Sequence, residues 1–213
     1  MIIYVNGDSH SAGHDAGGPA FSYGQHVADA LSAEFICSAV AACSNDSIIA
    51  RTVEYLENNT PDYIIIGWST WERETWCHDN ISYNITASGT DSVPLELRDQ
   101  YKQWVIDSTT PEFQHRKEEE NHIKIWQLHQ LLKSKNIPHL FFNCYSHFHY
   151  VTSHNKLRYD WEDNYVDPYD RNSTYYFWLE QHGYTPSNPK FYHYGADAHR
   201  AWAEFLLPQL KKL

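Results

Sequence analysis

The chain has 213 residues, enough to bury the core of one domain, and we expect a single domain over residues 1–213. Hydrophobic residues make up 42% of the chain and charged residues 20%, a balance typical of a compact globule rather than of a disordered segment. The formal net charge of −11 disfavours nucleic acid and anionic membrane as partners, because both need a basic surface. The oligomeric state stays open.

The cysteines and the first residues favour a cytoplasmic protein. Cys37, Cys43, Cys77 and Cys144 lie far apart, without the spacing of a metal site. Met1 leads directly into an apolar run, without the basic flank and long apolar stretch of a signal peptide. No segment approaches the roughly 20 apolar residues of a membrane span. We therefore expect reduced thiols, a soluble chain, and no bound cofactor or metal.

Short apolar runs alternate with helical patterns along the chain. Four runs are predicted as strands: 2–5, 34–41, 62–69 and 139–146. Helices are predicted over 23–34, over 45–59, from Thr110-Pro111 onward, and over 195–213, where Pro208 is expected to kink or shorten the helix. This alternation predicts an α/β fold with a mostly parallel sheet between helix layers, and a site beyond the carboxyl ends of the strands.

Two stretches interrupt the alternation. Residues 76–110 are polar and turn-rich, and residues 147–192 are dense in aromatic side chains. We interpret both as insertions over the edge of the site. A large loop needs a core of its own, so most of the aromatic side chains are expected to be buried there. The other interpretation is that their flat rings stack on sugar faces beside the site.

A polar motif, Gly7-Asp8-Ser9-His10, follows the first predicted strand. These residue types are common in turns, so the motif alone favours a structural turn. His193, however, directly precedes the C-terminal helix, which brings it to the same edge of the sheet. A serine hydroxyl becomes a nucleophile when a nearby imidazole takes its proton. His199, further along that helix, is expected to pack within the helix layer.

At these positions the chain resembles the SGNH (GDSL-type) hydrolase family over nearly its full length. The segments VNGDSHSAG, AVAACSNDSIIART, IIIGWSTWER and HYGADAHRAWAEFL resemble the four blocks of that family. The resemblance implies a three-layer α/β/α sandwich with a flavodoxin-like sheet. It also implies hydrolysis of esters of lipids, acylated sugars or small acyl groups, with Ser9 as the nucleophile and His193 as the base.

The chain departs from the family pattern at two places. The third block has Ser69-Thr70 where the family has Asn-Asp, so the usual oxyanion asparagine is missing. Lys190 stands where the family has an aspartate, three residues before the histidine. A backbone carbonyl or another acid would then have to hold the imidazole of His193.

Other residues are predicted to complete the site. The expected oxyanion donors are the backbone N–H groups of Ser9 and of the turn near Cys43, together with Asn45 or Ser69 in place of the missing amide. Trp68 and His10 are the predicted contacts to substrate. The function expected from this set is hydrolysis of small acyl esters, O-acyl groups on carbohydrate included, by a Ser–His mechanism.

Two rival functions remain. A non-catalytic module of the same fold would bind glycans or protein through the aromatic insertion. A metallophosphoesterase would use Asp8 and His10, with His147 and His149 as later ligands. The second alternative lacks the Gly-Asp-x-x-Asp and Gly-Asn-His segments that would supply the bridging ligands.

Overall fold

The structure, a computed structural model, describes residues 1–87, 89, 93–188 and 190–213. Its centre is a four-stranded sheet in the order β2-β1-β3-β6, in which all neighbouring strands are parallel. The strands are β1 (Ile2–Gly7), β2 (Glu34–Cys37), β3 (Tyr63–Trp68) and β6 (His139–Asn143). Tyr165 adds an isolated parallel bridge beside Phe141. The predicted, mostly parallel sheet is confirmed.

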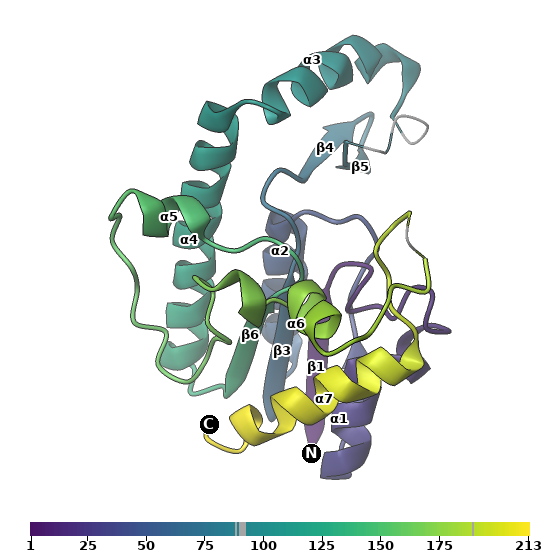
Figure 1. Cartoon of the computed structure of the whole chain (residues 1–213), viewed down its shortest axis with the longest axis vertical. Helices are drawn as coiled ribbons and strands as arrows, with labels where there is room; N and C mark the ends of the chain where they lie inside the picture. The colour runs from purple at the N-terminus through teal and green to yellow at the C-terminus, as the bar shows by residue number, and fades with distance from the viewer. Residues whose placement is uncertain (88, 90–92, 189) are drawn as a thin grey trace.

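Helices cover both faces of this sheet (Figure 1). The long helices are α1 (Tyr23–Leu31), α2 (Asn45–Asn58), α4 (Pro111–Ser134) and α7 (Ala196–Leu210). Because strand side chains alternate, Ile3 and Val5 pack with α1 and α7, whereas Tyr4 packs with α2 and α4. The predicted three-layer α/β/α arrangement is therefore confirmed.

Local chemistry sets where these helices begin and end. Ser44 caps α2 by accepting a hydrogen bond from the Ser47 N–H at 3.2 Å, and the Thr110 hydroxyl caps α4 ahead of Pro111, as predicted. Pro208 lies inside α7, which continues to Leu210, so the prediction that it ends the helix early is wrong. Among the described residues, no helix is long and apolar enough to cross a bilayer.

The first interrupting stretch forms an arm beyond the carboxyl ends of the strands, at the top of Figure 1. The arm contains β4 (Glu74–His78), β5 (Ile81–Ile85), η3 (Leu95–Leu97) and α3 (Arg98–Ser108). Its small core consists of Ile85, Val93, Tyr101, Trp104 and Phe113. Residues 88, 90–92 and 189, which fall within the two expected insertions, lie outside the described residues.

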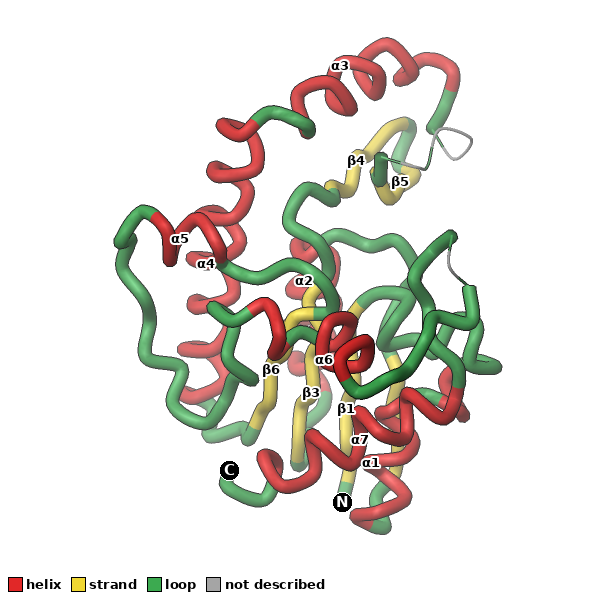
Figure 2. Tube along the Cα trace, in the orientation of Figure 1, coloured by secondary structure: helices red, strands yellow, loops and turns green. Residues whose placement is uncertain are grey.

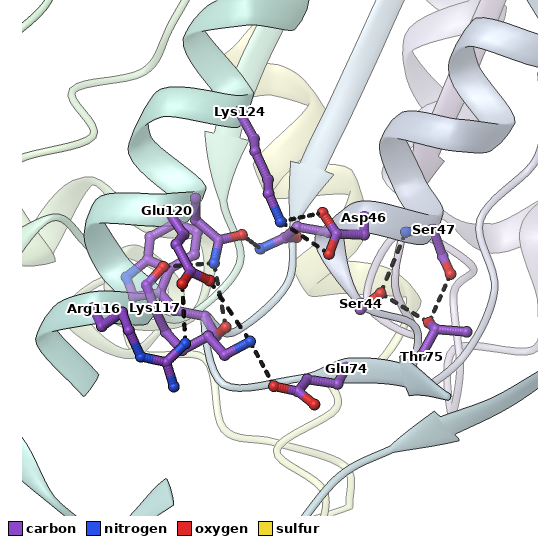
Figure 3. Close-up of polar contacts among 12 residues, drawn as sticks. Ser44, Asp46, Ser47, Glu74, Thr75, Arg116, Lys117, Glu120 and Lys124 are labelled. Atoms are coloured by element: carbon purple, nitrogen blue, oxygen red, sulfur yellow. Dashed lines mark hydrogen bonds and ion pairs between the residues drawn. The ribbon is translucent and has the colours of Figure 1, made fainter. Parts of the chain in front are cut away.

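Polar contacts fix the base of this arm to two helices (Figure 3). The Thr75 hydroxyl lies 2.9 Å from the Ser44 hydroxyl and 2.8 Å from that of Ser47, at the start of α2. Lys117 of α4 pairs with Glu74 at 2.5 Å. The first residues of β4 are therefore held against both helices.

The second interrupting stretch contains α5 (His149–Ser153), η4 (Arg171–Ser173) and α6 (Tyr175–Gln181). Six of the thirteen Phe, Trp and Tyr side chains in residues 147–192 are buried and two are exposed, so the prediction that most of them are buried is wrong. The buried ones do not form a separate core: Trp161 and Tyr165 join the cluster under α2 and α4, and Tyr175 joins the cluster under α1 and α7. A further short helix, η1 (Pro19–Phe21), precedes α1.

Loops gather beyond the carboxyl ends of the strands (Figure 2).

Candidate active site

The structure brings together the two residues that the sequence paired. Ser9 lies in the turn that follows β1, and His193 lies three residues before α7. His193 Nε2 is 2.9 Å from Ser9 Oγ. Both residues are largely buried, with 5% of Ser9 and 9% of His193 exposed. The pair therefore has the spacing that proton transfer from the hydroxyl to the imidazole requires.

Asp15 extends this pair into a chain of three side chains. Its Oδ2 lies 2.7 Å from His193 Nδ1. Because a carboxylate only accepts hydrogen bonds, Nδ1 is assigned the proton and Nε2 presents its lone pair to the Ser9 hydroxyl. The hydrogen bond from His193 lowers the pKa of Asp15, so the carboxylate is ionised at neutral pH. This is the tautomer that a base acting on Ser9 needs.

The sequence did not identify Asp15. Lys190, at the position where the family has its aspartate, is exposed, and its backbone N–H donates to the Asn188 side chain at 3.2 Å. Asp15 instead follows Ser9 by six residues, in a loop folded back by a His14 N–H to Ser9 C=O bond of 3.0 Å. It has a φ of 61°, a conformation that aspartate adopts more readily than most residues. The sequence left open whether a backbone carbonyl or another acid holds the His193 imidazole. In the structure the group in contact with Nδ1 is an acid, Asp15.

A cleft opens above these three residues. Ser9, Asp15 and His193 line a pocket of about 350 Å³, whose other walls include Arg73 and Phe191. A second pocket of about 430 Å³ shares Arg73, Thr86 and Phe191 with the first and adds His10, Thr70, Tyr145 and Tyr192. The two pockets therefore adjoin at these shared residues, and together we call them the cleft; the side chains of Phe191 and Tyr192, which line it, are about half exposed.

Two residues that line the first pocket have backbone N–H groups without an acceptor among the described residues. These residues are Ser9 and Ala42. Ala42 has a φ of 61°, a left-handed conformation within the turn before α2. The prediction placed this donor near Cys43, but the Cys43 N–H donates to the Val40 carbonyl at 3.4 Å and its side chain is fully buried. The available donor is one residue earlier.

The two side chains predicted to replace the oxyanion asparagine are used elsewhere. Asn45 donates to the Ser69 carbonyl at 3.2 Å and to Asn121 Oδ1 at 2.9 Å, and it accepts the Ser69 N–H at 2.9 Å. Ser69 in turn donates its hydroxyl to Asp8 Oδ2 at 3.3 Å. Neither side chain retains a donor for an oxyanion, so these two predictions are wrong. Together they fix the loop after β3.

This network predicts that Asn45→Ala destabilises the protein. The substitution leaves the buried Ser69 N–H and Asn121 Oδ1 without their partner, and each unpaired buried group costs about 1–3 kcal/mol. We expect the free energy of unfolding, measured by urea denaturation, to fall by about 2–6 kcal/mol. Asn59→Ala, at the exposed C-terminal end of α2, is the matched control. Equal urea midpoints for the two variants would contradict the structural role of Asn45.

The two predicted substrate contacts differ in outcome. Trp68 is fully buried, with its ring 5.2 Å from that of Phe141 in the core, so the prediction that it touches substrate is wrong. His10 lines the second pocket, and its ring lies 5.1 Å from that of His193. Burial lowers the pKa of His10 to about 4, so the ring is neutral at pH 7. Its contact with substrate stays a prediction.

The residues proposed for a metal centre do not gather in one place. Within the described part of the chain, no three His, Cys, Asp or Glu side chains are placed to hold a metal ion. Asp8 pairs with Arg73 at 3.0 Å, and His147 lines a different pocket, with Trp71. His199 is buried and accepts the Tyr23 N–H at 3.2 Å, so it links α7 to α1 within the helix layer, as predicted.

Comparisons with known proteins bear on the fold. No family model and no curated protein sequence matches the chain. A solved carbohydrate esterase superposes with a TM-score of 0.56 at 14% identity, over 100% of this chain and 65% of that one. A member of the lipolytic G-D-S-L family from Veillonella parvula gives 0.51 at 12% identity, over 100% of both chains. The acetyl xylan esterase AlAXEase gives 0.51 at 10% identity, over 98% of each chain.

These similarities define the class of fold. The chain spans less than two thirds of the length of the first of these proteins, but nearly all of the other two. The fold is that of the SGNH, or GDSL-type, hydrolases, as the resemblance of the sequence blocks predicted. At 10–14% identity the similarity establishes the fold, and the chemistry has to be argued from the site.

Proposed function

We propose that the protein is a serine ester hydrolase that cleaves small acyl esters, O-acyl groups on carbohydrate among them. One observation carries this proposal: the unbroken hydrogen-bonded series Asp15–His193–Ser9 along a pocket of about 350 Å³. A serine, a base and an acid in this order are the parts of the known serine hydrolase mechanism, which has arisen on unrelated folds.

The first half of the reaction forms an acyl-enzyme. Ser9 Oγ attacks the carbonyl carbon of the ester while its proton passes to His193 Nε2, and Asp15 stabilises the resulting imidazolium. The carbonyl oxygen becomes an oxyanion that accepts hydrogen bonds from the N–H groups of Ser9 and Ala42. When the tetrahedral intermediate collapses, the bond to the leaving oxygen breaks and His193 donates its proton to the departing alcohol.

The second half releases the acid. His193, neutral again, takes a proton from a water molecule, and the resulting hydroxide attacks the acyl carbon. The bond between the acyl carbon and Ser9 Oγ breaks, and the proton on His193 returns to the serine. The free carboxylic acid leaves, and the site regains its starting hydrogen bonds.

The cleft favours a small acyl group on a polar alcohol. The pocket at Ser9 mixes polar and apolar walls, and the exposed rings of Phe191 and Tyr192 continue along the cleft. Such rings stack on the apolar faces of sugars while neighbouring polar groups bind hydroxyls. Carbohydrate esterases among the structural neighbours agree with this choice.

Labelling with a fluorophosphonate probe tests the proposal. We expect the probe to lose fluoride and to form an adduct on Ser9, located by mass spectrometry, that is absent in Ser9→Ala and present in the control Ser134→Ala. A folded wild-type protein that takes up no probe and hydrolyses no ester would contradict the proposal. Glycan binding that survives Ser9→Ala would then favour the non-catalytic binding module.

A further inference from the structure

The proposed oxyanion hole has two backbone donors and no side-chain donor among the residues predicted from the sequence. Ser69 stands where GDSL-type hydrolases have an asparagine, and its N–H and hydroxyl donate to Asn45 and Asp8. The Nδ2 group of Asn45 donates one hydrogen bond to the Ser69 carbonyl and one to Asn121 Oδ1, so neither N–H is left for an oxyanion. A third donor, if the site has one, has to come from another residue on the wall of the pocket.

Arg73 is a candidate for this donor, because it lines the pocket at Ser9 and contacts Ser69. Its Nη1 donates a hydrogen bond to Ser69 Oγ at 2.7 Å. The guanidinium therefore lies next to the end of the Ser69 side chain, near the space that a longer asparagine side chain at position 69 would fill. Nη1 also lies 3.0 Å from Oδ2 of Asp8, the residue that precedes Ser9. Arg73 and Ser9 line the same pocket. No residue in the described ranges accepts a hydrogen bond from Nε or Nη2 of Arg73, so these groups are free to donate.

The ion pair with Asp8 holds this guanidinium in place. Only 2% of the Asp8 side chain and 19% of the Arg73 side chain are exposed. Burial acts to raise the pKa of Asp8, but nearby positive charge and hydrogen bonds outweigh it, and the pKa is lowered. The charges that lower this pKa are those of His10 and Arg73, and of the two only the Arg73 guanidinium is charged at pH 7.

The arm holds Arg73 from the other side. Arg73 directly precedes β4, whose first two residues, Glu74 and Thr75, are tied to α4 and to the start of α2 (Figure 3). The Arg73 side chain is therefore held at Nη1 by Asp8 and Ser69, and the residues that follow its backbone are tied to two helices. Donors that are already in place where charge develops need no reorganisation during the reaction, which is the condition for strong transition-state stabilisation.

We propose that Arg73 supplies the side-chain donor of the oxyanion hole, in the place that an asparagine has in GDSL-type hydrolases. This role rests on the proposed esterase function. A guanidinium donates charge-assisted hydrogen bonds, which are about twice as strong as neutral ones. Its hydrogen bond strengthens as the carbonyl oxygen gains charge, so Arg73 acts on the transition state more than on the bound ester.

The test compares Arg73→Met with the double variant Asp8→Asn/Arg73→Met. In Arg73→Met we expect kcat for p-nitrophenyl acetate to fall by about 10²–10³-fold while KM changes little, because the lost interaction is made only in the transition state. Phosphonylation of Ser9 is expected to slow in parallel. The double variant removes the buried unpaired carboxylate, so it keeps the chain folded and is expected to stay as slow. Arg171→Met, beside a different pocket, is the matched control.

The outcomes separate the possible roles of Arg73. A double variant with nearly wild-type kcat would show that Arg73 only balances the charge of Asp8, and would overturn the proposal. A rise in KM at unchanged kcat would also overturn it, because Arg73 would then bind the substrate in its ground state. In both cases wild-type protein still labels at Ser9. Absence of labelling and of ester hydrolysis in wild-type protein would instead overturn the esterase function, and the role of Arg73 with it.

Discussion

Replacing Ser9 or His193 with alanine is expected to lower kcat for ester hydrolysis by about 10⁴-fold or more. Without the Ser9 hydroxyl no acyl-enzyme forms, and without the His193 imidazole nothing takes the proton from that hydroxyl. Since the two side chains act as one unit, the double variant is expected to be no slower than the slower single variant.

The fold should tolerate both substitutions. Ser9→Ala removes a single oxygen, and His193 lies in a loop at the mouth of a pocket rather than in either core cluster. Circular dichroism and thermal unfolding are therefore expected to match those of the wild type. Ser134→Ala and His182→Ala, both at exposed positions away from the pocket, should keep full activity. Wild-type rates in either site variant would refute its assignment.

The order of strands and helices could be predicted because it depends on local patterns. Buried parallel strands have nearly continuous apolar sequences, and the helices repeat their apolar residues with helical spacing. The ends of the elements are less certain. The second strand was expected over 34–41 but ends at Cys37, because the chain then turns toward α2 and the Val40 N–H donates to the Gly7 carbonyl.

The placement of Trp68 could have been predicted from the same pattern. Side chains alternate along a strand, so Trp68 faces the same way as Ile64 and Ile66, which pack under α2 and α4. Its position beside Ser69 in the sequence suggested a place at the site, but the period of two places it in the core.

The roles of Asn45 and Ser69 depend on contacts that sequence position does not show. Asn45 is close to the proposed oxyanion turn along the chain, yet its amide binds Asn121, which lies 76 residues further on in α4. Arg73 was missed for a similar reason, since only folding brings its guanidinium to Ser69 and Asp8. A buried polar group binds whatever partner the fold places nearest, and the sequence alone does not name that partner.

Asp15 is the clearest case of a proposed site residue without a sequence signal. In the segment AGHDAGG an aspartate among small residues indicates a turn, and the family pattern directs attention to Lys190 instead. The triad needs only a carboxylate within reach of His193 Nδ1, from any part of the chain. The loop after β1 places Asp15 within that reach, so the proposed nucleophile and the proposed acid come from the same turn region.

Asp15→Asn is accordingly expected to lower kcat by about 10²–10⁴-fold, with the larger end of that range known for fully buried triad aspartates. The reason is the tautomer: the asparagine amide can donate to Nδ1, which moves the ring proton to Nε2 and removes the acceptor for the Ser9 hydroxyl. Asp15→Ala leaves the ring free to choose its tautomer and is expected to be less impaired. The measurement is kcat for a small ester, with Asp29→Asn on the exposed side of α1 as the control.

The two Asp15 variants distinguish a triad from a dyad. If Asp15 fixes the tautomer, Asp15→Asn is slower than Asp15→Ala, and Ser9 labelling by a fluorophosphonate slows in the same order. Because 38% of the Asp15 side chain is exposed, water can take over part of its hydrogen bond to His193 in Asp15→Ala. Wild-type kcat in both variants would mean that Ser9 and His193 work as a dyad, and that the 2.7 Å contact with Asp15 only anchors the loop.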